Sequence, residues 1–158
     1  MAGGMKKINP AHVEALVRTA NTCPYFILLS MEMKSFDCGE SRLEIEVQEK
    51  HLQPFGIVHG GVCASLVDAA AFWAVYPQMD EDIGLTTVEI KVNYLAPVSG
   101  GRLIARGKYI KVGKNICLGE ATVEDTKGML VAHGTSTMMV LDSLKIEGHS
   151  QLPPKFID

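Results

Sequence analysis

The stretch from Gly60 to Tyr76 reads GGVCASLVDAAAFWAVY, and it decides the fold of this chain. Its residues favour a helix that is apolar on nearly every side, and such a helix lies inside a core or a membrane. Asp68 is the only formally charged residue between Lys50 and Asp80. A lone carboxylate buried there costs several kcal/mol by order of magnitude unless it is paired or hydrated. We therefore expect Asp68 to face a cleft as a candidate functional group.

Composition and charge restrict the class of protein. The 158 residues, 47% hydrophobic and 21% charged, predict one globular domain over residues 1–158. The net charge of −3 gives no general attraction to nucleic acid or to an anionic membrane, so neither is expected as a partner. The apolar stretch around Asp68 is shorter than we expect for a membrane span. Residues 1–7 lack a secretory signal, and the four cysteines lack Cys-x-x-Cys spacing, so we expect a cytoplasmic protein with reduced thiols.

The segments before the apolar helix predict one short helix and two strands. A helix is expected over about residues 10–22, with Asn9 as its N-cap and Pro10 in its first position. The apolar run 26–33 is typical of a strand. Residues 42–48 alternate strictly between apolar and polar, which predicts a half-exposed strand.

The segments after the apolar helix predict a meander of strands and a loose tail from about residue 142. The first strand, 86–94, alternates with Val88 and Ile90 on one side, which places Thr87 on the other unless a bulge intervenes. This grouping of elements favours an α+β fold, with a curved antiparallel sheet of five to six strands wrapped around the apolar helix. The remaining strands are expected over residues 103–112, 116–124 and 129–141.

Two glycines, Gly60 and Gly61, begin the apolar helix. The first N–H groups of a helix are unpaired and carry partial positive charge, which suits an anion or a developing oxyanion; tight packing of the helix on the sheet is the structural alternative. Asp68 lies eight residues further on, about 12 Å along the helix axis. One small carbonyl group cannot reach both points of the same chain. A shared site therefore requires two chains, as in an isologous dimer with antiparallel helices.

The motif QPFGIVHGGVCASLVDA, residues 53–69, closely resembles the signature of hotdog-fold acyl-CoA thioesterases. It is most similar to the phenylacetate-pathway and thioesterase-superfamily-member branch, related to 4-hydroxybenzoyl-CoA thioesterases. The resemblance continues through residues 92–97 and 128–134. It implies a hotdog fold, in which an antiparallel sheet wraps around a central helix. It also implies homodimers with shared active sites, which often pair into homotetramers.

The resemblance also implies catalytic roles. The N–H of Gly60 would polarise the thioester carbonyl, and Asp68 from the other subunit would act as nucleophile or general base. Thr87, on the following strand, would supply a hydroxyl that positions water or the acid. The family has Asn where this chain has Gln53, which offers the same amide on a longer side chain. No metal or other cofactor is implied, because coenzyme A enters only as part of the substrate.

Other residues are candidates for substrate binding. His59 and Gly61 flank Gly60, and His59 either contacts the thioester or holds the loop, the role we favour. Phe55 either lines an acyl or aryl pocket or packs in the core. Lys111 and Lys114 either meet the phosphates of coenzyme A or belong to a solvated strand face.

The sequence therefore predicts hydrolysis of a small to medium acyl- or aryl-CoA thioester to the free acid and coenzyme A. A hotdog hydratase or dehydratase is one alternative, but that branch pairs its Asp with a His five residues later, where this chain has Trp73. A non-catalytic acyl-CoA-binding module is the other alternative. No His-x-His or His-Glu-x-x-His spacing indicates a metal site.

Overall fold

The computed structural model of the protein describes residues 7–157. Both ends of the predicted domain 1–158 lie outside the described residues, and so do residues 1–6 of the segment expected to lack a secretory signal. Its helices are α1 (Pro10–Thr22), α2 (Pro24–Leu29) and α3 (Gly60–Val75), with short 3-10 turns at Glu49–His51, Tyr76–Gln78 and His149–Gln151. Its strands are β1 (Lys7–Ile8), β2 (Met31–Asp37), β3 (Glu40–Glu46), β4 (Gly84–Tyr94), β5 (Arg102–Lys111), β6 (Ile116–Asp125), β7 (Leu130–Leu141) and β8 (Phe156–Ile157).

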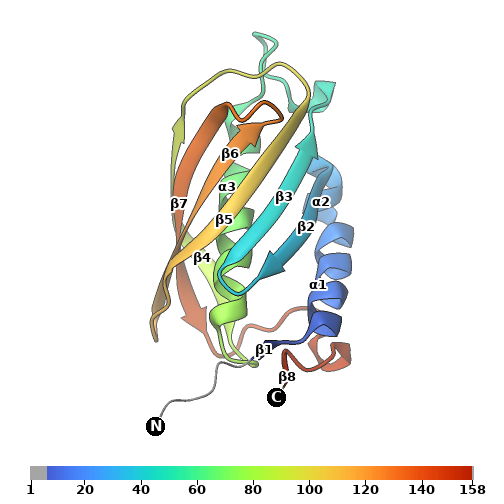
Figure 1. Ribbon diagram of the computed structural model, residues 1–158, viewed down its shortest axis with the longest axis vertical. Helices are drawn as coiled ribbons and strands as arrows, with labels where there is room; N and C mark the ends of the chain where they lie inside the picture. Colours follow the sequence, from blue (N-terminus) through green and yellow to red (C-terminus); the bar gives the residue numbers. More distant parts are fainter. Residues whose placement is uncertain (1–6, 158) are drawn as a thin grey trace.

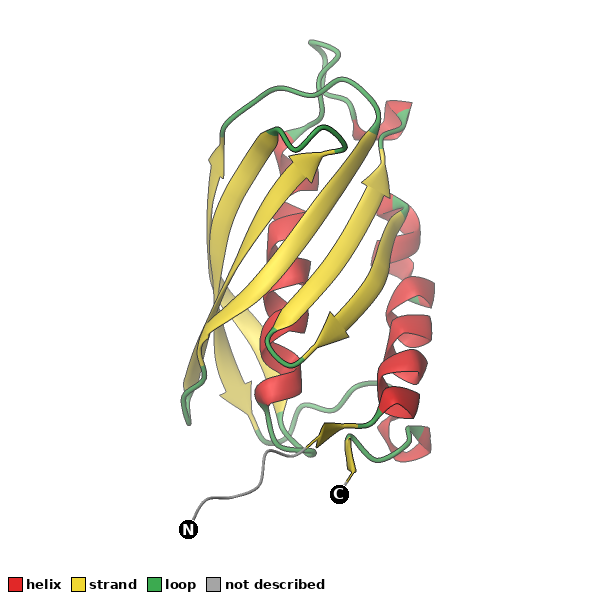
Figure 2. Cartoon of the chain, viewed as in Figure 1, coloured by secondary structure: helices red, strands yellow, loops and turns green. Residues whose placement is uncertain are grey.

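Six of these strands form one antiparallel sheet in the order β2-β3-β5-β6-β7-β4. The sheet curves around α3, while α1 lies beside the edge strand β2 (Figure 1). Figure 2 shows the same layers by element type, with β1 and β8 paired near the two described ends of the chain. The predicted α+β class, and the sheet of up to six strands around a central helix, are confirmed.

The sheet approaches α3 closely because small residues face each other. A side chain at Gly107 of β5 would place its Cβ 2.0 Å from the carbonyl oxygen of Ala70, and one at Gly119 of β6 would lie 2.8 Å from that of Ala71. Both alanines are fully buried. Only glycine permits this backbone approach, so these positions bring the helix into the sheet.

The central helix has nearly the expected bounds, since its α-helical part runs from Gly60 to Val75. Together with the following 3-10 turn it forms a continuous helical segment, Gly60–Gln78, of 19 residues, and its length and composition alone would suffice to cross a membrane. The expectation that this stretch is too short for a span was therefore wrong. In the structure the sheet wraps the helix, which packs as a core element.

The segment before β2 is helical, contrary to the strand expected over 26–33. Pro24 occupies the first turn of α2, where its fixed φ favours a helix. The helix ends at Ser30, which adopts a left-handed conformation with φ of 49°. The strand therefore begins only at Met31. In contrast, α1 occupies Pro10–Thr22, and the Asn9 side chain accepts a hydrogen bond from the N–H of Ala11, as an N-cap does.

A β-bulge divides β4. The pairing of β4 with β7 shifts between Thr87 and Glu89, so Val88 is an extra residue in the strand. Before the bulge, Thr87 lies opposite the inward-facing Met138, and after it Ile90 lies opposite the buried Ser136. Odd-numbered residues before the bulge and even-numbered residues after it thus face α3. Val88 itself is 53% exposed, contrary to the inward position expected from simple alternation.

The C-terminal segment is docked on the fold, contrary to the loose tail expected from residue 142. The ammonium of Lys155 is fully buried and donates hydrogen bonds to the carbonyl oxygens of Tyr76, at 2.8 Å, and Met79, at 2.7 Å. The N–H of Asn9 donates to the carbonyl of Lys155, and β8 pairs with β1. Carbonyls at a helix C-terminus attract a cation, and a buried ammonium needs such partners. Sequence patterning did not reveal this contact because it joins residues that are far apart in the chain.

Candidate active site

Asp68 is held by two hydroxyl groups from different strands. The Thr87 Oγ1–H donates to Asp68 Oδ1 at 2.9 Å, and the Ser136 Oγ–H donates to the same oxygen at 2.8 Å. Within residues 7–157, no described hydrogen bond uses the second oxygen, Oδ2. The carboxylate is therefore fixed in orientation while one oxygen stays available to an incoming group.

Three elements place this cluster. Asp68 lies midway along α3, Thr87 precedes the bulge of β4, and Ser136 lies on β7 beside it. Ser136 is fully buried, and we did not predict it as a site residue. The signal was present in the sequence, because Ser136 is a polar side chain at an inward position of an otherwise apolar strand. Buried polar groups of that kind require a partner.

The carboxylate of Asp68 opens into a pocket of about 400 Å³. Its walls are mostly apolar and come from α3, α2, β2 and β4. At one side, Tyr25 of α2 shares a 2.7 Å hydrogen bond with Ser65, whose hydroxyl also donates to the carbonyl of Gly61. The apolar lining residues are Phe26, Met31, Ala64, Ala69, Phe72, Trp73 and Ile90.

Gly60 forms the first residue of α3. His59 is the N-cap, and its Nδ1 accepts a hydrogen bond of 2.8 Å from the N–H of Gly61. The Gly61 N–H is thus occupied, whereas the Gly60 N–H makes no hydrogen bond among those described for residues 7–157. The Tyr94 ring covers Gly60 closely, since a Cβ there would lie 3.0 Å from Tyr94 Cζ. His59 therefore organises the helix start and leaves the Gly60 N–H as the open donor.

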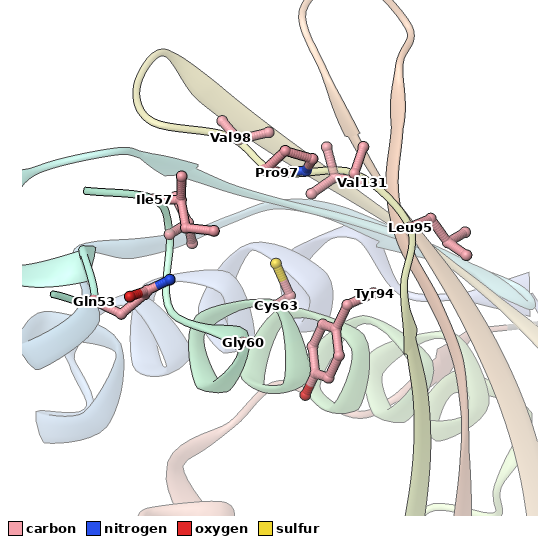
Figure 3. Close-up of a pocket in the computed structure, with 11 residues that line it drawn as sticks. Gln53, Ile57, Gly60, Cys63, Tyr94, Leu95, Pro97, Val98 and Val131 are labelled. Carbon is pink, nitrogen blue, oxygen red and sulfur yellow. The ribbon is translucent and has the colours of Figure 1, made fainter. Parts of the chain in front are cut away.

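Gln53 lies in the same pocket as Gly60 (Figure 3). Its Oε1 accepts a hydrogen bond of 2.8 Å from the backbone N–H of Phe55, which fixes the amide so that its NH₂ group is left for other partners. The Phe55 ring is 89% exposed and lines neither this pocket nor that of Asp68. Phe55 therefore contributes its backbone N–H to this site, whereas its ring lies outside both pockets.

The pocket of Gly60 and Gln53 has a volume of about 350 Å³ and a largely apolar wall. Figure 3 shows the Cys63 sulfur directed into it, opposite Ile57 and Pro97. Burial raises the pKa of the Cys63 thiol to about 11. Because the thiolate is the reactive form, Cys63 acts here as a wall and not as a nucleophile.

Within one chain, Gly60 and Asp68 open into different pockets. This agrees with the separation of about 12 Å along the helix expected from their spacing. Lys111 ends β5 and Lys114 lies in the following loop; both are exposed, and neither lines either pocket. The structure thus brings together Asp68 with Thr87, and Gly60 with Gln53, as two half-sites. Among the described residues, no group of three or more His, Cys, Asp or Glu side chains is arranged to hold a metal ion.

Comparison with known proteins identifies the family. Residues 55–132 match the family described as the Thioesterase superfamily. The chain is 30% identical over 112 residues to a 1,4-dihydroxy-2-naphthoyl-CoA hydrolase of Listeria monocytogenes, covering 71% of this chain and 91% of that protein. It is also 28% identical to acyl-coenzyme A thioesterase 13 of Mus musculus, covering 60% of this chain and 68% of that protein. The chain belongs to the thioesterase superfamily.

Solved structures confirm the hotdog fold. A thioesterase from Haemophilus influenzae superimposes with a TM-score of 0.79 at 24% identity, covering 89% of this chain and 98% of that one. A thioesterase family protein from Silicibacter pomeroyi gives a TM-score of 0.72 at 28% identity, covering 79% and 95%. Both structural matches extend well beyond the motif at residues 53–69, so these proteins share the curved sheet and the central helix.

Proposed function

We propose that this protein is an acyl-CoA thioesterase that hydrolyses small to medium acyl- or aryl-CoA thioesters to the free acid and coenzyme A. One observation carries the proposal: Asp68 on the central helix has one oxygen held by two hydroxyls and the other directed to an apolar pocket. Among the described residues the second oxygen has no hydrogen-bond partner, so it can take a proton from water or attack a carbonyl carbon. Membership of a family with named CoA-thioester hydrolases supports the same reaction class.

Asp68 supplies the chemistry in this proposal. As a general base, its Oδ2 takes a proton from water while the water oxygen adds to the thioester carbonyl carbon. Collapse of the tetrahedral intermediate breaks the carbon–sulfur bond, and the proton passes to the departing thiolate. As a nucleophile, Oδ2 instead attacks the carbonyl carbon, and the carbon–sulfur bond breaks to release the coenzyme A thiolate. Water then hydrolyses the resulting anhydride to the free acid and the Asp68 carboxylate, and its proton passes to the thiolate. Thr87 and Ser136 act as positioning residues in both routes, because they hold the carboxylate through Oδ1.

Gly60 and Gln53 supply the second half of the proposed reaction. The unpaired Gly60 N–H, at the positive end of α3, would stabilise the oxyanion that develops on the thioester carbonyl. The free NH₂ of Gln53, in the same pocket, is a second donor for that oxygen or for water. Neither role requires a metal or another cofactor.

The two half-sites meet, in this proposal, across an isologous dimer. Antiparallel α3 helices from two chains would bring Gly60 of one chain to Asp68 of the other. The edge strand β4 supports the arrangement, because its outer side has no partner strand in the described sheet. Val88, Ile90 and Tyr94 along it are large apolar residues that are 53%, 41% and 59% exposed. Exposed apolar side chains on an open edge mark an interface. Two such dimers would then form the tetramer expected from the sequence.

The test is release of free thiol from acetyl-, butyryl-, octanoyl-, benzoyl- and phenylacetyl-CoA, followed by the same assay on Asp68→Asn. We expect turnover of one or more of these thioesters, and a fall in kcat of roughly a hundredfold to ten-thousandfold in the variant, the usual range for loss of a general base. Asp142→Asn, an exposed acid outside both pockets, is the matched control. Binding of acyl-CoA without turnover would instead identify a non-catalytic binding module, and normal kcat in Asp68→Asn would exclude this mechanism.

A further inference from the structure

A second apolar pocket lies beyond Asp68, toward the C-terminal end of α3. Its volume is about 220 Å³. Phe72 lines both this pocket and the pocket of Asp68, so the two pockets are neighbours that share this side chain. We call it the distal pocket; its main apolar walls are Phe72, Tyr76, Ile83, Leu85, Leu144 and Ile146.

The residues between the carboxylate and the distal pocket follow one line. Asp68, Phe72 and Tyr76 are spaced by four, so they lie above one another on the same face of α3. Tyr76 is two turns, about 12 Å, beyond Asp68. On the facing strand, Leu85 precedes Thr87 by two positions and therefore shares its inward side. An elongated ligand that passes Asp68 thus meets apolar side chains from both elements as it continues.

The C-terminal tail closes the far end of this pocket. Leu144 packs so tightly against the start of β4 that a Cβ on Gly84 would lie 2.2 Å from the Leu144 carbonyl oxygen. Lys145 forms an ion pair of 3.1 Å with Asp82 at the rim. Further along, Lys155 ties the tail to the carbonyls that follow α3. The tail beyond residue 141 lies outside residues 55–132, which the family matches.

We infer that the distal pocket binds the end of a linear, medium-length acyl chain, and that the C-terminal tail thereby sets chain-length preference. The inference rests on the proposed function and names its substrate class. The pocket exceeds the cavity of about 150 Å³ that is known to take a benzene-sized group. The coenzyme A arm does not suit it, because that arm carries amides and phosphates, whereas this pocket is largely apolar. Lys145 and His149 at the rim are already paired with Asp82. An acyl group too short to pass Phe72 would stay in the pocket of Asp68.

The kinetic test compares butyryl-CoA with decanoyl-CoA in Ile146→Trp. The indole fills the distal pocket from the tail, so we expect the ratio of kcat/KM for decanoyl-CoA to that for butyryl-CoA to fall at least about tenfold, since each buried methylene contributes roughly fourfold. Glu147→Trp is the matched control, because the neighbouring residue is exposed and does not line the pocket. Leu144→Trp, at a 43% exposed wall position, repeats the test if Ile146→Trp does not fold.

A binding test separates this inference from the proposed function. Decyl-CoA and butyl-CoA thioethers cannot be hydrolysed, and calorimetry measures their affinities for each variant. Tighter binding of the decyl compound that is lost in Ile146→Trp but kept in Glu147→Trp supports the distal pocket, even if wild type turns over no thioester and the proposed function fails. Equal affinity of the two thioethers for wild type, or an unchanged preference in the folded tryptophan variants, would overturn the inference.

Discussion

Thr87 Oγ1 lies 2.9 Å from Asp68 Oδ1, although regular alternation along β4 would turn Thr87 away from the central helix. The bulge at Val88 reverses that alternation, so Thr87 shares the inward side with Ile90. Bulges redirect side chains in this way and are common beside active sites. The inserted residue therefore has a local consequence for the candidate site: it brings a second hydroxyl to the carboxylate that Ser136 already binds.

The hydroxyls of Thr87 and Ser136 should act as one unit. We expect Thr87→Val and Ser136→Ala each to lower kcat roughly tenfold to a hundredfold, since a hydrogen bond to a charged group contributes about 1.5–3 kcal/mol. The double variant should lose less than the product of the two effects, because both bonds serve the same oxygen. Steady-state kinetics with the best thioester measures this. Thr87→Ser should restore activity, whereas Thr137→Ala, on the opposite face of β7, should behave as wild type. Full activity in both single variants would show that the carboxylate needs no positioning.

The Gly60 N–H can be removed without altering the helix start. Gly60 occupies the first helical position, where Pro is favourable, and His59 before it has φ of −64° and ψ of 136°, which Pro permits. We expect Gly60→Pro to lower kcat roughly a hundredfold or more, the usual loss of an oxyanion donor. Gly60→Ala is the matched control, because it adds a Cβ near the hydroxyl end of the Tyr94 ring but keeps the N–H. Equal losses in the two variants would point to the Cβ and would remove the oxyanion role.

Subunit complementation tests the shared site. Asp68→Asn and Gly60→Pro should each be inactive alone. A heterodimer of the two has one site with an intact Asp68 and an intact Gly60, so the purified heterodimer should have about half of wild-type activity and a random mixture of dimers about a quarter. Co-expression with two affinity tags and kinetics on the doubly tagged species provide the measurement. No recovery in a heterodimer that has formed would place both groups in one chain.

Light scattering tests the proposed dimer interface separately: Ile90→Arg should show a smaller assembly than wild type.

His12 should make stability depend on pH. It is 2% exposed, its Nδ1 lies 2.7 Å from the carbonyl oxygen of Pro153, and its Nε2 lies 3.4 Å from the hydroxyl of Tyr76. The carbonyl only accepts, so Nδ1 carries the proton and Nε2 accepts from Tyr76. Desolvation by burial lowers the pKa of His12 below 6.5, opposed by the hydrogen bond to Pro153.

The sign of the pH effect follows from that direction. A lowered pKa means that the folded state binds the proton more weakly than the unfolded state does. The stabilisation is therefore complete above about pH 6.5 and is lost as the pH falls through the folded-state pKa. Urea unfolding of wild type and His12→Gln between pH 7.5 and 5 should show a steeper acid loss in wild type. Parallel curves would contradict the assignment.

Patterning along the sequence located much of the site but not all of it. The apolar helix with its single carboxylate identified Asp68, and the glycine pair identified the start of α3. Ser136 was missed because its partner lies 68 residues away, although a hydroxyl at an inward position of its strand was a local sign that it needs a partner. The ring of Phe55 was expected either in an acyl pocket or in the core, whereas it is 89% exposed and its backbone N–H contacts Gln53. Such contacts depend on how distant segments meet, and local periodicity does not encode that.

By itself the sequence determined which segments are buried, because hydrophobic periodicity follows directly from which side of a helix or strand meets water. It thereby specified the α+β class, the central helix and its isolated carboxylate. Only the tertiary structure decided that a bulge at Val88 turns Thr87 inward, that Ser136 joins it, and that Lys155 docks the tail over the distal pocket. These outcomes depend on strand register and on hydrogen bonds between buried polar groups that are far apart in the chain. Both are decided only when the segments pack together, because no single segment contains both partners.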